Sequence, residues 1–253
     1  MTAIRRLNHQ VGFDLVMFRR NPAAAFFTLI LPLIFFLLFT AIFGNETNEA
    51  GVRIATYYVP GIMTLQITSA TLVNLAMAMT TRRERGLLKR LRATPLPPWV
   101  FIASQATASI VISAVASVFL IVVGRLVFDV SVRAAGVPSL VVSIALGSAC
   151  LAALGLALST IIPSEEAAPA ITNVLVLPLY FISDVFIPGD KPRALEFIAS
   201  LFPVQHLATA LQPAFDPLAV GVTWPWRDWL VLAAWGLFGV AVARSRFRWV
   251  PSR

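Results

Sequence analysis

Hydrophobic residues in this chain gather in long runs that are almost free of charge and are separated by short polar segments. Six of these runs approach the ~20 residues that a helix needs to cross the ~30 Å hydrocarbon layer of a membrane. The predicted spans are residues 23–43, 57–79, 99–123, 139–162, 167–187 and 229–243. The last run is short. Trp224, Trp226 and Trp229 form an aromatic belt typical of a membrane interface, so this span is expected to begin nearer Trp224.

Residues 1–21 predict a helix of another kind. Apolar residues recur there at intervals of three and four, which places them on one face of a helix while the arginines point elsewhere. These apolar residues are Ile4, Leu7, Val11, Leu15 and Phe18. One interpretation is an amphipathic helix at the membrane interface, and the other is a solvated tail with coincidental periodicity. Pro22 follows Asn21 and suits the first turn of a new helix, so the first span should start there.

Residues 188–228 are too apolar for an ordinary external loop, in which many of their side chains would face water. The apolar side chains include Leu195, Phe197, Ile198, Leu201 and Phe202. We expect either short re-entrant helices packed against protein or an amphipathic helix on the membrane surface. The predicted fold is therefore all-α. It is a single integral membrane domain over residues 1–253, with six transmembrane helices, an N-terminal interfacial helix and short re-entrant helices before the last span.

The charge pattern predicts the orientation of these spans. Of the 253 residues, 58% are hydrophobic and 13% are charged, whereas soluble proteins have about 25% charged residues. Of the 20 lysines and arginines, four precede residue 22, six lie in residues 80–98 and four follow residue 243. The positive-inside rule places these three segments and both termini in the cytoplasm. The loop 163–166 must then be cytoplasmic too, although it carries no basic residue.

Several function classes are disfavoured. The net charge of +8 does not indicate a nucleic-acid binder, because the basic residues lie between apolar runs rather than on a soluble face. The sequence contains no HExxH, Walker or GxSxG motif, and its two histidines lie far apart. Cys150 lies alone in an apolar run, so neither a disulfide nor a cysteine metal site is expected. We expect no catalytic residue, metal or cofactor in this chain, and the scarcity of charge in the spans disfavours a membrane enzyme or a secondary transporter.

The cytoplasmic segment 80–98 carries the most informative pattern. Thr81 and Glu84 fit a capping box at the start of a helix, and Pro95 would end that helix. Glu84 would lie among Leu87, Leu88 and Leu91 on one face, opposite a basic face of Arg82, Arg85, Lys89 and Arg92. Such a helix suits either anionic lipid headgroups or a groove on a cytoplasmic partner. A carboxylate amid leucines favours the partner.

Four stretches in a fixed order carry a family resemblance. They are residues 57–62 (Tyr-Tyr-Val-Pro-Gly-Ile), 84–96 (Glu-Arg-Gly-Leu-Leu-Lys-Arg-Leu-Arg-Ala-Thr-Pro-Leu), 178–188 (Pro-Leu-Tyr-Phe-Ile-Ser-Asp-Val-Phe-Ile-Pro) and 246–249 (Arg-Phe-Arg-Trp). Together with the six-span plan, they resemble the membrane permeases of type 2 ABC exporters, especially the branch that includes antibiotic-resistance exporters. Their order and spacing match across essentially the whole chain.

The resemblance implies a bacterial cell-membrane permease that exports a lipophilic drug, lipid or other amphiphile, with a polysaccharide or glycolipid as the alternative cargo. It implies a homodimer, or a pair of related permeases, on two separately encoded ATP-binding subunits that hold ATP and Mg. Residues 84–96 would be the coupling helix that docks on the ATPase. The implied docking residues are Glu84, Arg85, Gly86, Leu87, Leu88 and Leu91. Glu165 and Glu166 would either form a second, lesser contact or be simply solvated.

The remaining candidates are polar residues in or near the spans. Where the family commonly has Ser-Gly, this chain has Ser183 and Asp184. The Asp184 carboxylate would either meet a cationic amphiphile or pair with Lys191 or Arg193. Gln66, Asn74 and Asn173 would either line a translocation path or form hydrogen bonds between helices. The sequence leaves the identity of the substrate open.

Overall fold

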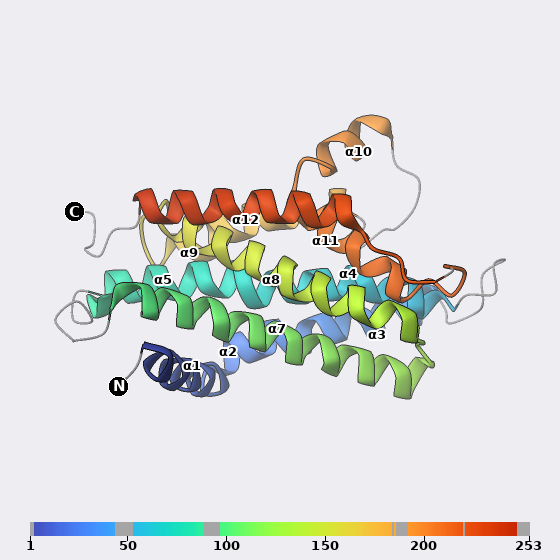
Figure 1. The fold of residues 1–253 in the computed structure, drawn as a ribbon, viewed down its shortest axis with the longest axis horizontal. Coiled ribbons are helices and arrows are strands. Elements are labelled where there is room, and N and C mark those ends of the chain that lie inside the picture. The colour runs from blue at the N-terminus through green and yellow to red at the C-terminus, as the bar shows by residue number, and fades with distance from the viewer. Residues whose placement is uncertain are drawn as a thin grey trace.

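The computed structural model describes residues 3–43, 53–88, 97–183, 185, 192–219 and 221–246. Helices make up most of these residues, and no strand is found among them. The long helices lie side by side along the longest axis of the molecule, as Figure 1 shows. The prediction of an all-α membrane fold is confirmed.

Within the described ranges, five helical stretches are long and apolar enough to cross a membrane. They are α2–η1–α3 (Pro22–Ala25, Phe26–Ile30, Leu31–Phe43), α4–η2–α5 (Ile54–Thr68, Ser69–Val73, Asn74–Glu84), α7 (Pro98–Phe128), η3–α8 (Ala134–Gly136, Val137–Ser159) and α12 (Trp226–Arg246). Each overlaps a predicted span, and α12 begins two residues after Trp224. In the predicted span 167–187, helix α9 (Ala167–Ile182) has 16 residues, which is short for a full crossing.

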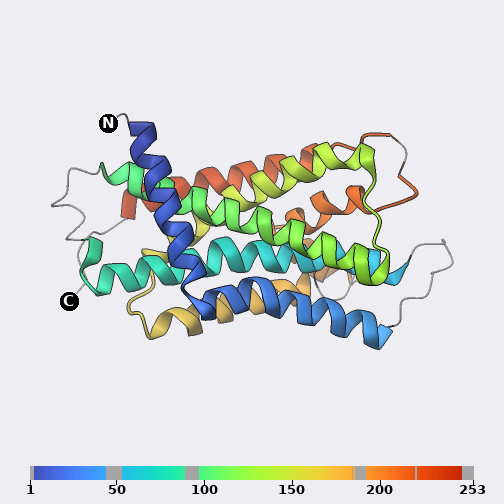
Figure 2. The same ribbon diagram turned by 90° about the horizontal axis from the view of Figure 1, so that it is seen from below.

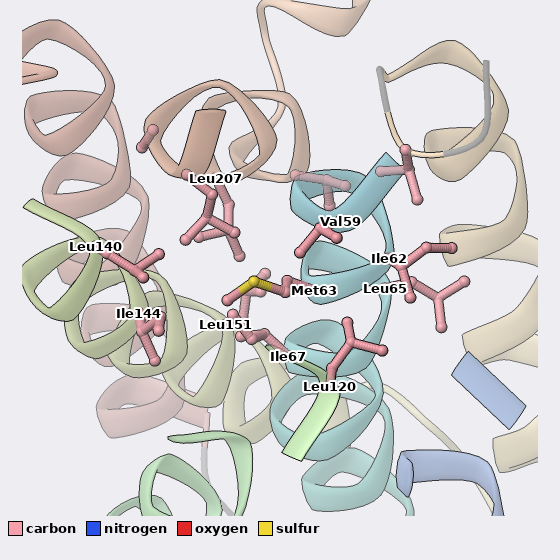
Figure 3. Packing of buried hydrophobic residues seen from close by; sticks show 14 of the residues in the cluster. Val59, Ile62, Met63, Leu65, Ile67, Leu120, Leu140, Ile144, Leu151 and Leu207 are labelled. Atoms are coloured by element: carbon pink, nitrogen blue, oxygen red, sulfur yellow. The ribbon is translucent and has the colours of Figure 1, made fainter. Parts of the chain in front are cut away.

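The second and fourth spans form the centre of the molecule. In their most apolar windows, 72% of α4–η2–α5 and 67% of η3–α8 are buried, against 17% of α12. Figure 3 shows the core between them, where Ile62 and Met63 of α4 meet Leu151 of α8, Leu120 of α7 and Leu207 of α11 (Pro203–Leu211). This cluster joins four helices that are far apart in sequence, so the spans pack as one body.

Helix α8 approaches the second span closely where its side chains are small. A Cβ atom at Gly155 would lie 2.7 Å from the carbonyl oxygen of Leu72 in η2. Any larger residue there would push the two backbones apart, and small residues are what close helix packing in membranes requires. Cys150 lies buried on the same helix, and it packs as a small apolar residue in the core.

The first and second spans each contain one π-helical turn, η1 and η2. Such turns are rare and concentrate at functional sites. Asn74, directly after η2, donates a hydrogen bond from Nδ2 to Oγ1 of Thr28 in η1 over 2.8 Å. The hydrogen bond joins the irregular parts of the two spans, so Asn74 forms one of the interhelical bonds that the sequence left open.

Helix α1 (Ala3–Arg19) crosses the ends of the spans at a steep angle and packs against α7 (Figure 2). It ends before Asn21, whose side-chain oxygen accepts a hydrogen bond from the Ala24 N–H over 3.1 Å and so caps α2. Pro22 occupies the first position of that helix, which confirms the predicted start of the first span.

The apolar stripe of α1 faces the protein more than the lipid. Its four later members, Leu7, Val11, Leu15 and Phe18, are half-buried, whereas Ile4 is exposed. The exposed side of α1 carries further large apolar residues, namely Phe13, Val16 and Met17. The predicted apolar stripe of α1 thus packs against the bundle. The apolar side chains on its other side suit a membrane interface.

The segment before the last span folds as two helices, α10 (Arg193–Ala199) and α11, which meet at an angle of 95°. The second helix continues into η4 (Gln212–Ala214) and packs against α8 and α12. The first helix leaves its apolar side chains exposed, among them Leu195, Phe197 and Ile198. Helix α11 is therefore packed on protein, as the re-entrant alternative predicts, whereas α10 is exposed and its contact with a membrane surface stays a prediction.

A set of polar contacts holds this re-entrant segment, which lies outside the spanning helices. His206 on α11 places Nδ1 2.7 Å from the Asp228 carboxylate and Nε2 2.9 Å from the Ser200 carbonyl oxygen. Trp229 donates from Nε1 to the Ser143 hydroxyl, which in turn donates to the Ala210 carbonyl. Both ring nitrogens of His206 face acceptors, so the doubly protonated ring fits the site best.

The described parts of the three basic segments lie at one end of the bundle, which we call the basic end. Figure 1 shows the start of α1 and the end of α12 there, beside the end of α5. Ala243, near the end of α12, packs against the cluster that contains Leu88 and Phe101. The described parts of the basic segments therefore lie at the same end of the bundle, and their cytoplasmic orientation stays a prediction.

Candidate functional site

The second span ends at a left-handed glycine. Gly86 has a φ of +68° and follows Arg85 at the end of α5, where its N–H donates to the Arg83 carbonyl over 3.1 Å. This is a common way for a helix to stop. Thr81 and Glu84 lie in the last turns of α5, so the prediction of a capping box at the start of a separate helix is wrong. The span helix continues past residue 79 and ends only at this glycine.

The turn at Gly86 separates the leucines of the predicted docking face. Leu88 is fully buried and packs against Met79 and Phe101, whereas Leu87 is 41% exposed. Leu91 lies outside the described residues. Of these two leucines, Leu87 therefore exposes its side chain, and Leu88 anchors the segment to the bundle.

The two predicted contact segments lie against each other. Arg85 donates to both carboxylate oxygens of Glu165, from Nε over 3.1 Å and from Nη2 over 2.7 Å. The Glu84 carboxylate accepts a hydrogen bond from the backbone N–H of Glu165. We call Glu84, Arg85 and Glu165 the acid–base cluster. The cluster also places the loop 163–166 at the basic end, together with the other segments that are predicted to be cytoplasmic.

The ion pair between Arg85 and Glu165 is exposed to solvent. The Glu165 carboxylate raises the pKa of Arg85 through its hydrogen bonds and charge. Bidentate pairs of this kind hold both side chains in a fixed orientation. Glu166, the next residue, is exposed just before α9 and has its carboxylate on the same loop. The surface thus combines fixed charges with the exposed Leu87.

Arg83 supports this surface from within. Its side chain is only 8% exposed. It donates from Nη1 to the Ser159 carbonyl over 2.7 Å and from Nη2 to the Ile162 carbonyl. These carbonyls belong to the end of α8 and the loop after it, where helix geometry leaves acceptors without intrahelical donors. Arg83 thereby fixes the end of the fourth span to the end of the second.

A further buried contact ties α1 to the same region. Asp14 is buried, with one carboxylate oxygen 3.5 Å from Nη2 of Arg82 and the other accepting from the Ser104 hydroxyl over 3.0 Å. The Arg82 guanidinium also stacks over the Phe101 ring at 5.5 Å. The basic face that the sequence predicted is therefore divided, because Arg82 turns towards the N-terminal helix and Arg85 towards the loop before α9.

An apolar groove with a volume of about 870 Å³ runs along the second span, between the first span and α9. Asn74 and Asn173 line it, whereas Gln66 does not. Gln66 is fully buried, and its amide has no hydrogen-bond partner among the described residues. Ser183 is buried outside the groove, and Asp184 and Lys191 lie outside the described residues. Two of the five predicted pathway residues therefore meet at one groove.

Sequence reasoning missed two residues that organise this site. Arg83 is one of several arginines in a row, and nothing in the sequence distinguishes the buried one. Asp14 offered a signal, because it lies between Val11 and Leu15 on the apolar stripe of α1. A carboxylate on a buried helix face requires a charged or hydrogen-bonding partner, and this requirement points to a basic residue at the same end.

Five helical stretches that can each cross a membrane define a multi-pass membrane protein. The family described as ABC-2 type transporter matches residues 13–215. The chain therefore belongs to the ABC-2 type transporter family, and it is a membrane component of a transporter rather than a catalytic subunit.

Two curated relatives illustrate this similarity. The daunorubicin resistance ABC transporter permease protein DrrB1 of Streptomyces coeruleorubidus is 28% identical over 206 residues, which cover 78% of this chain and 70% of that protein. The inner membrane transport permease YhhJ of Escherichia coli is 24% identical over 192 residues, which cover 74% of this chain and 51% of that protein.

Proposed function

We propose that this chain is the permease subunit of an ATP-driven exporter that moves a lipophilic drug, a lipid or a similar amphiphile out of a bacterial cell. Two separate ATP-binding subunits supply the energy and bind ATP and Mg. A second copy of the chain, or a related permease, completes the pathway. The basic end and both termini face the cytoplasm, in accord with the excess of lysine and arginine there.

The observation that carries this proposal is the acid–base cluster at the basic end. Glu84, Arg85 and Glu165 present fixed charges next to the exposed Leu87, on a segment that starts directly at the end of the second span. A partner that binds this surface would contact the end of the second span directly, with no flexible linker between the docking residues and the span. That is the geometry a mechanical coupling site requires.

The coupling then works through two spans at once. A movement of the partner subunits would displace the end of α5, and Arg83 would carry the displacement to the end of α8. The loop before α9 would follow through Arg85 and Glu165. Packed helices change between discrete arrangements rather than deforming continuously, so such a displacement suits alternating inward-open and outward-open states.

The lining of the groove supports an amphiphilic cargo. Most of its residues are apolar or aromatic, including Phe27, Phe35, Val73 and Tyr180. Such a surface suits hydrocarbon and planar aromatic groups and offers few partners to the hydroxyls of a sugar chain. The name of the relative DrrB1, a daunorubicin resistance permease, agrees with a drug as cargo.

A charge swap at the cluster tests the docking surface. We expect Arg85→Glu and Glu165→Arg each to reduce drug transport by reconstituted permease and ATPase strongly, because each places like charges together. The double variant restores the pair with reversed polarity and should recover the fold of the loop. If the ATPase binds the individual charges of Arg85 and Glu165, transport stays low in the double variant.

The measurements are co-purification of the ATPase and transport of a fluorescent amphiphile into vesicles. Arg244→Glu, at an exposed position near the end of α12, is the matched control. Full transport by both single variants would contradict the docking assignment. Transport of a labelled polysaccharide, with none of any amphiphile, would contradict the cargo and leave the docking surface intact.

A further inference from the structure

The bent segment before the last span is held at its bend by a residue that titrates near neutral pH. We call Ser200, Leu201 and Phe202 the elbow, because α10 and α11 meet there at 95°. The Ser200 carbonyl oxygen lies 2.9 Å from Nε2 of His206 on α11, and the Leu201 carbonyl accepts a hydrogen bond from Nε1 of Trp235 on α12 over 3.1 Å. The Phe202 ring stacks on Trp235. Among the described residues, these contacts fix the elbow to the bundle.

Helix α10 depends on the elbow for its position. Most of its side chains are exposed, whereas Ala199 at its end is buried. Helix α10 packs mainly against α9, and the elbow ties it to α11 and α12. The loss of one elbow contact therefore allows α10 to change its angle to α11.

The ring of His206 can satisfy both of its neighbours only as a cation. Its Nδ1 lies 2.7 Å from the Asp228 carboxylate and its Nε2 lies against the Ser200 carbonyl, and both of these groups are acceptors. A protonated imidazole has two N–H donors, whereas a neutral one has a single donor. The hydrogen bond to Asp228 raises the pKa of His206 above its ordinary value of 6.5, so the cation persists to higher pH than in a free histidine.

Loss of the proton breaks one particular contact. The remaining N–H stays with the Asp228 carboxylate, because a hydrogen bond to a charged acceptor is stronger than one to a carbonyl. Nε2 then presents a lone pair to the Ser200 carbonyl oxygen at 2.9 Å, and two acceptors at that distance repel each other. The elbow thus loses its contact with α11 and keeps its contact with Trp235 on α12.

The helices around α11 leave Asp228 as the counter-ion of His206. Helices α4, α8, α9 and α12 pack against α11, and the first three contain no charged residue. Their titratable side chains are neutral around pH 7, where histidine titrates. These side chains are Tyr57, Tyr58, Cys150 and Tyr180.

The remaining charged groups near this segment do not replace that counter-ion. Arg227 on α12 and both charged residues of α10, Arg193 and Glu196, are exposed to solvent. Asp216, in the loop after η4, lines a cavity that Asp228 also lines. This second carboxylate favours the cationic ring as well, so the charge of His206 follows from its surroundings as a whole.

We propose that His206 is a pH-sensitive switch that holds α10 against the bundle when its ring is protonated and releases the elbow when its ring is neutral. The bond that breaks is the one to the Ser200 carbonyl, and α10 then turns about the elbow. On the predicted orientation this segment faces the outside of the cell, so the external pH sets its position. The switch goes beyond the proposed export function, because it requires neither an ATPase nor a cargo.

Spin-label distances in the purified full-length chain test the switch. Phe197→Cys on α10 and Leu230→Cys on α12 place labels at two exposed positions, in a Cys150→Ala background. Double electron–electron resonance in nanodiscs measures the distance between the labels from about pH 5 to about pH 9, which spans the titration of histidine. We expect a narrow distribution at low pH and a shifted or broader one at high pH, with a midpoint above 6.5. The same distribution at both ends of the range would overturn the proposal.

Four variants assign the transition to His206. His206→Gln cannot gain a charge and should abolish it. Asp228→Asn keeps the shape of the side chain and removes the charge that stabilises the cation, so the midpoint should fall by about one pH unit. Trp235→Phe removes the other elbow hydrogen bond, so it should broaden the distribution at every pH and leave the midpoint in place. His9→Gln, at an exposed position on α1, is the matched control and should change nothing.

Two results would contradict the assignment. A transition that persists in His206→Gln would belong to another group. A midpoint that stays in place in Asp228→Asn would show that the carboxylate does not hold the proton on His206.

Discussion

Arg83 offers the sharpest test of how the basic end is held together. We consider Arg83→Met, which keeps a long side chain and removes the guanidinium. The change withdraws the donors from the carbonyls of Ser159 and Ile162. Since Arg83 is only 8% exposed, water cannot readily replace them.

The expected cost follows from these two bonds. Hydrogen bonds from a charged donor contribute roughly 1.5–3 kcal/mol each, which gives about 3–6 kcal/mol for the pair. Removing a buried cation recovers part of this, because the guanidinium no longer has to be desolvated. We therefore expect a net loss of about 2–4 kcal/mol in the free energy of unfolding. For a chain of this size, that corresponds to a decrease of roughly 4–15 °C in the melting temperature.

The assay is thermal unfolding in detergent, followed by hydrogen exchange of the backbone. Exchange should increase at residues 160–166, where the loop loses its support, and remain unchanged at the far end of α8. Arg83→Lys keeps the charge and loses the fork geometry, so it should fall between the wild type and Arg83→Met. Arg244→Met controls for the loss of an exposed arginine. A melting temperature within about 1 °C of the wild type would refute the reasoning.

Three further predictions concern other parts of the fold. Gly86→Ala should lower the free energy of unfolding in detergent by about 1–2 kcal/mol, because of the left-handed φ alone. Gly12→Ala, at an open position on α1, should not lower it. Gly155→Ala should cost about 1–3 kcal/mol in the same assay, since its Cβ would meet the η2 backbone at 2.7 Å. The hydrogen bond to Asp228 raises the pKa of His206, so its stabilisation is complete below about pH 6.5 and is lost as pH rises through the folded-state pKa. The stability difference between wild type and His206→Gln should shrink with rising pH, and a constant difference would contradict this.

The spans could be predicted from the sequence because their signal is local. A run of apolar residues must be solvated by lipid whatever it packs against, and Asn21 with Pro22 determines a helix start through its own backbone chemistry. The sequence predicts Gly86 as part of the docking segment. Its role in ending the helix depends on a φ value that the sequence does not reveal. The capping-box prediction failed for the same reason, since Thr81 and Glu84 fit a helix start and lie in a continuing helix.

The contacts that assemble the basic end could not be predicted, because they join residues far apart in sequence. Each residue advances about 100° around a helix, so Arg82, Arg83 and Arg85 point in different directions, and their surroundings decide which is buried. Arg83 faces the end of α8, whereas Arg82 faces Asp14 on α1. Likewise, nothing in the sequence indicates that Glu165 pairs with Arg85, because the two residues lie 80 positions apart.

The bond between Asn74 and Thr28 has a consequence for how the first two spans can move. A π-helical turn holds one residue more than an α-helical turn, so a span that lost its π turn would rotate everything beyond it by about 100°. Such a rotation in η2 would carry Asn74 away from Thr28, and one in η1 would carry Thr28 away from Asn74. The register of each span therefore depends on that of the other, and the two must convert together or stay as they are.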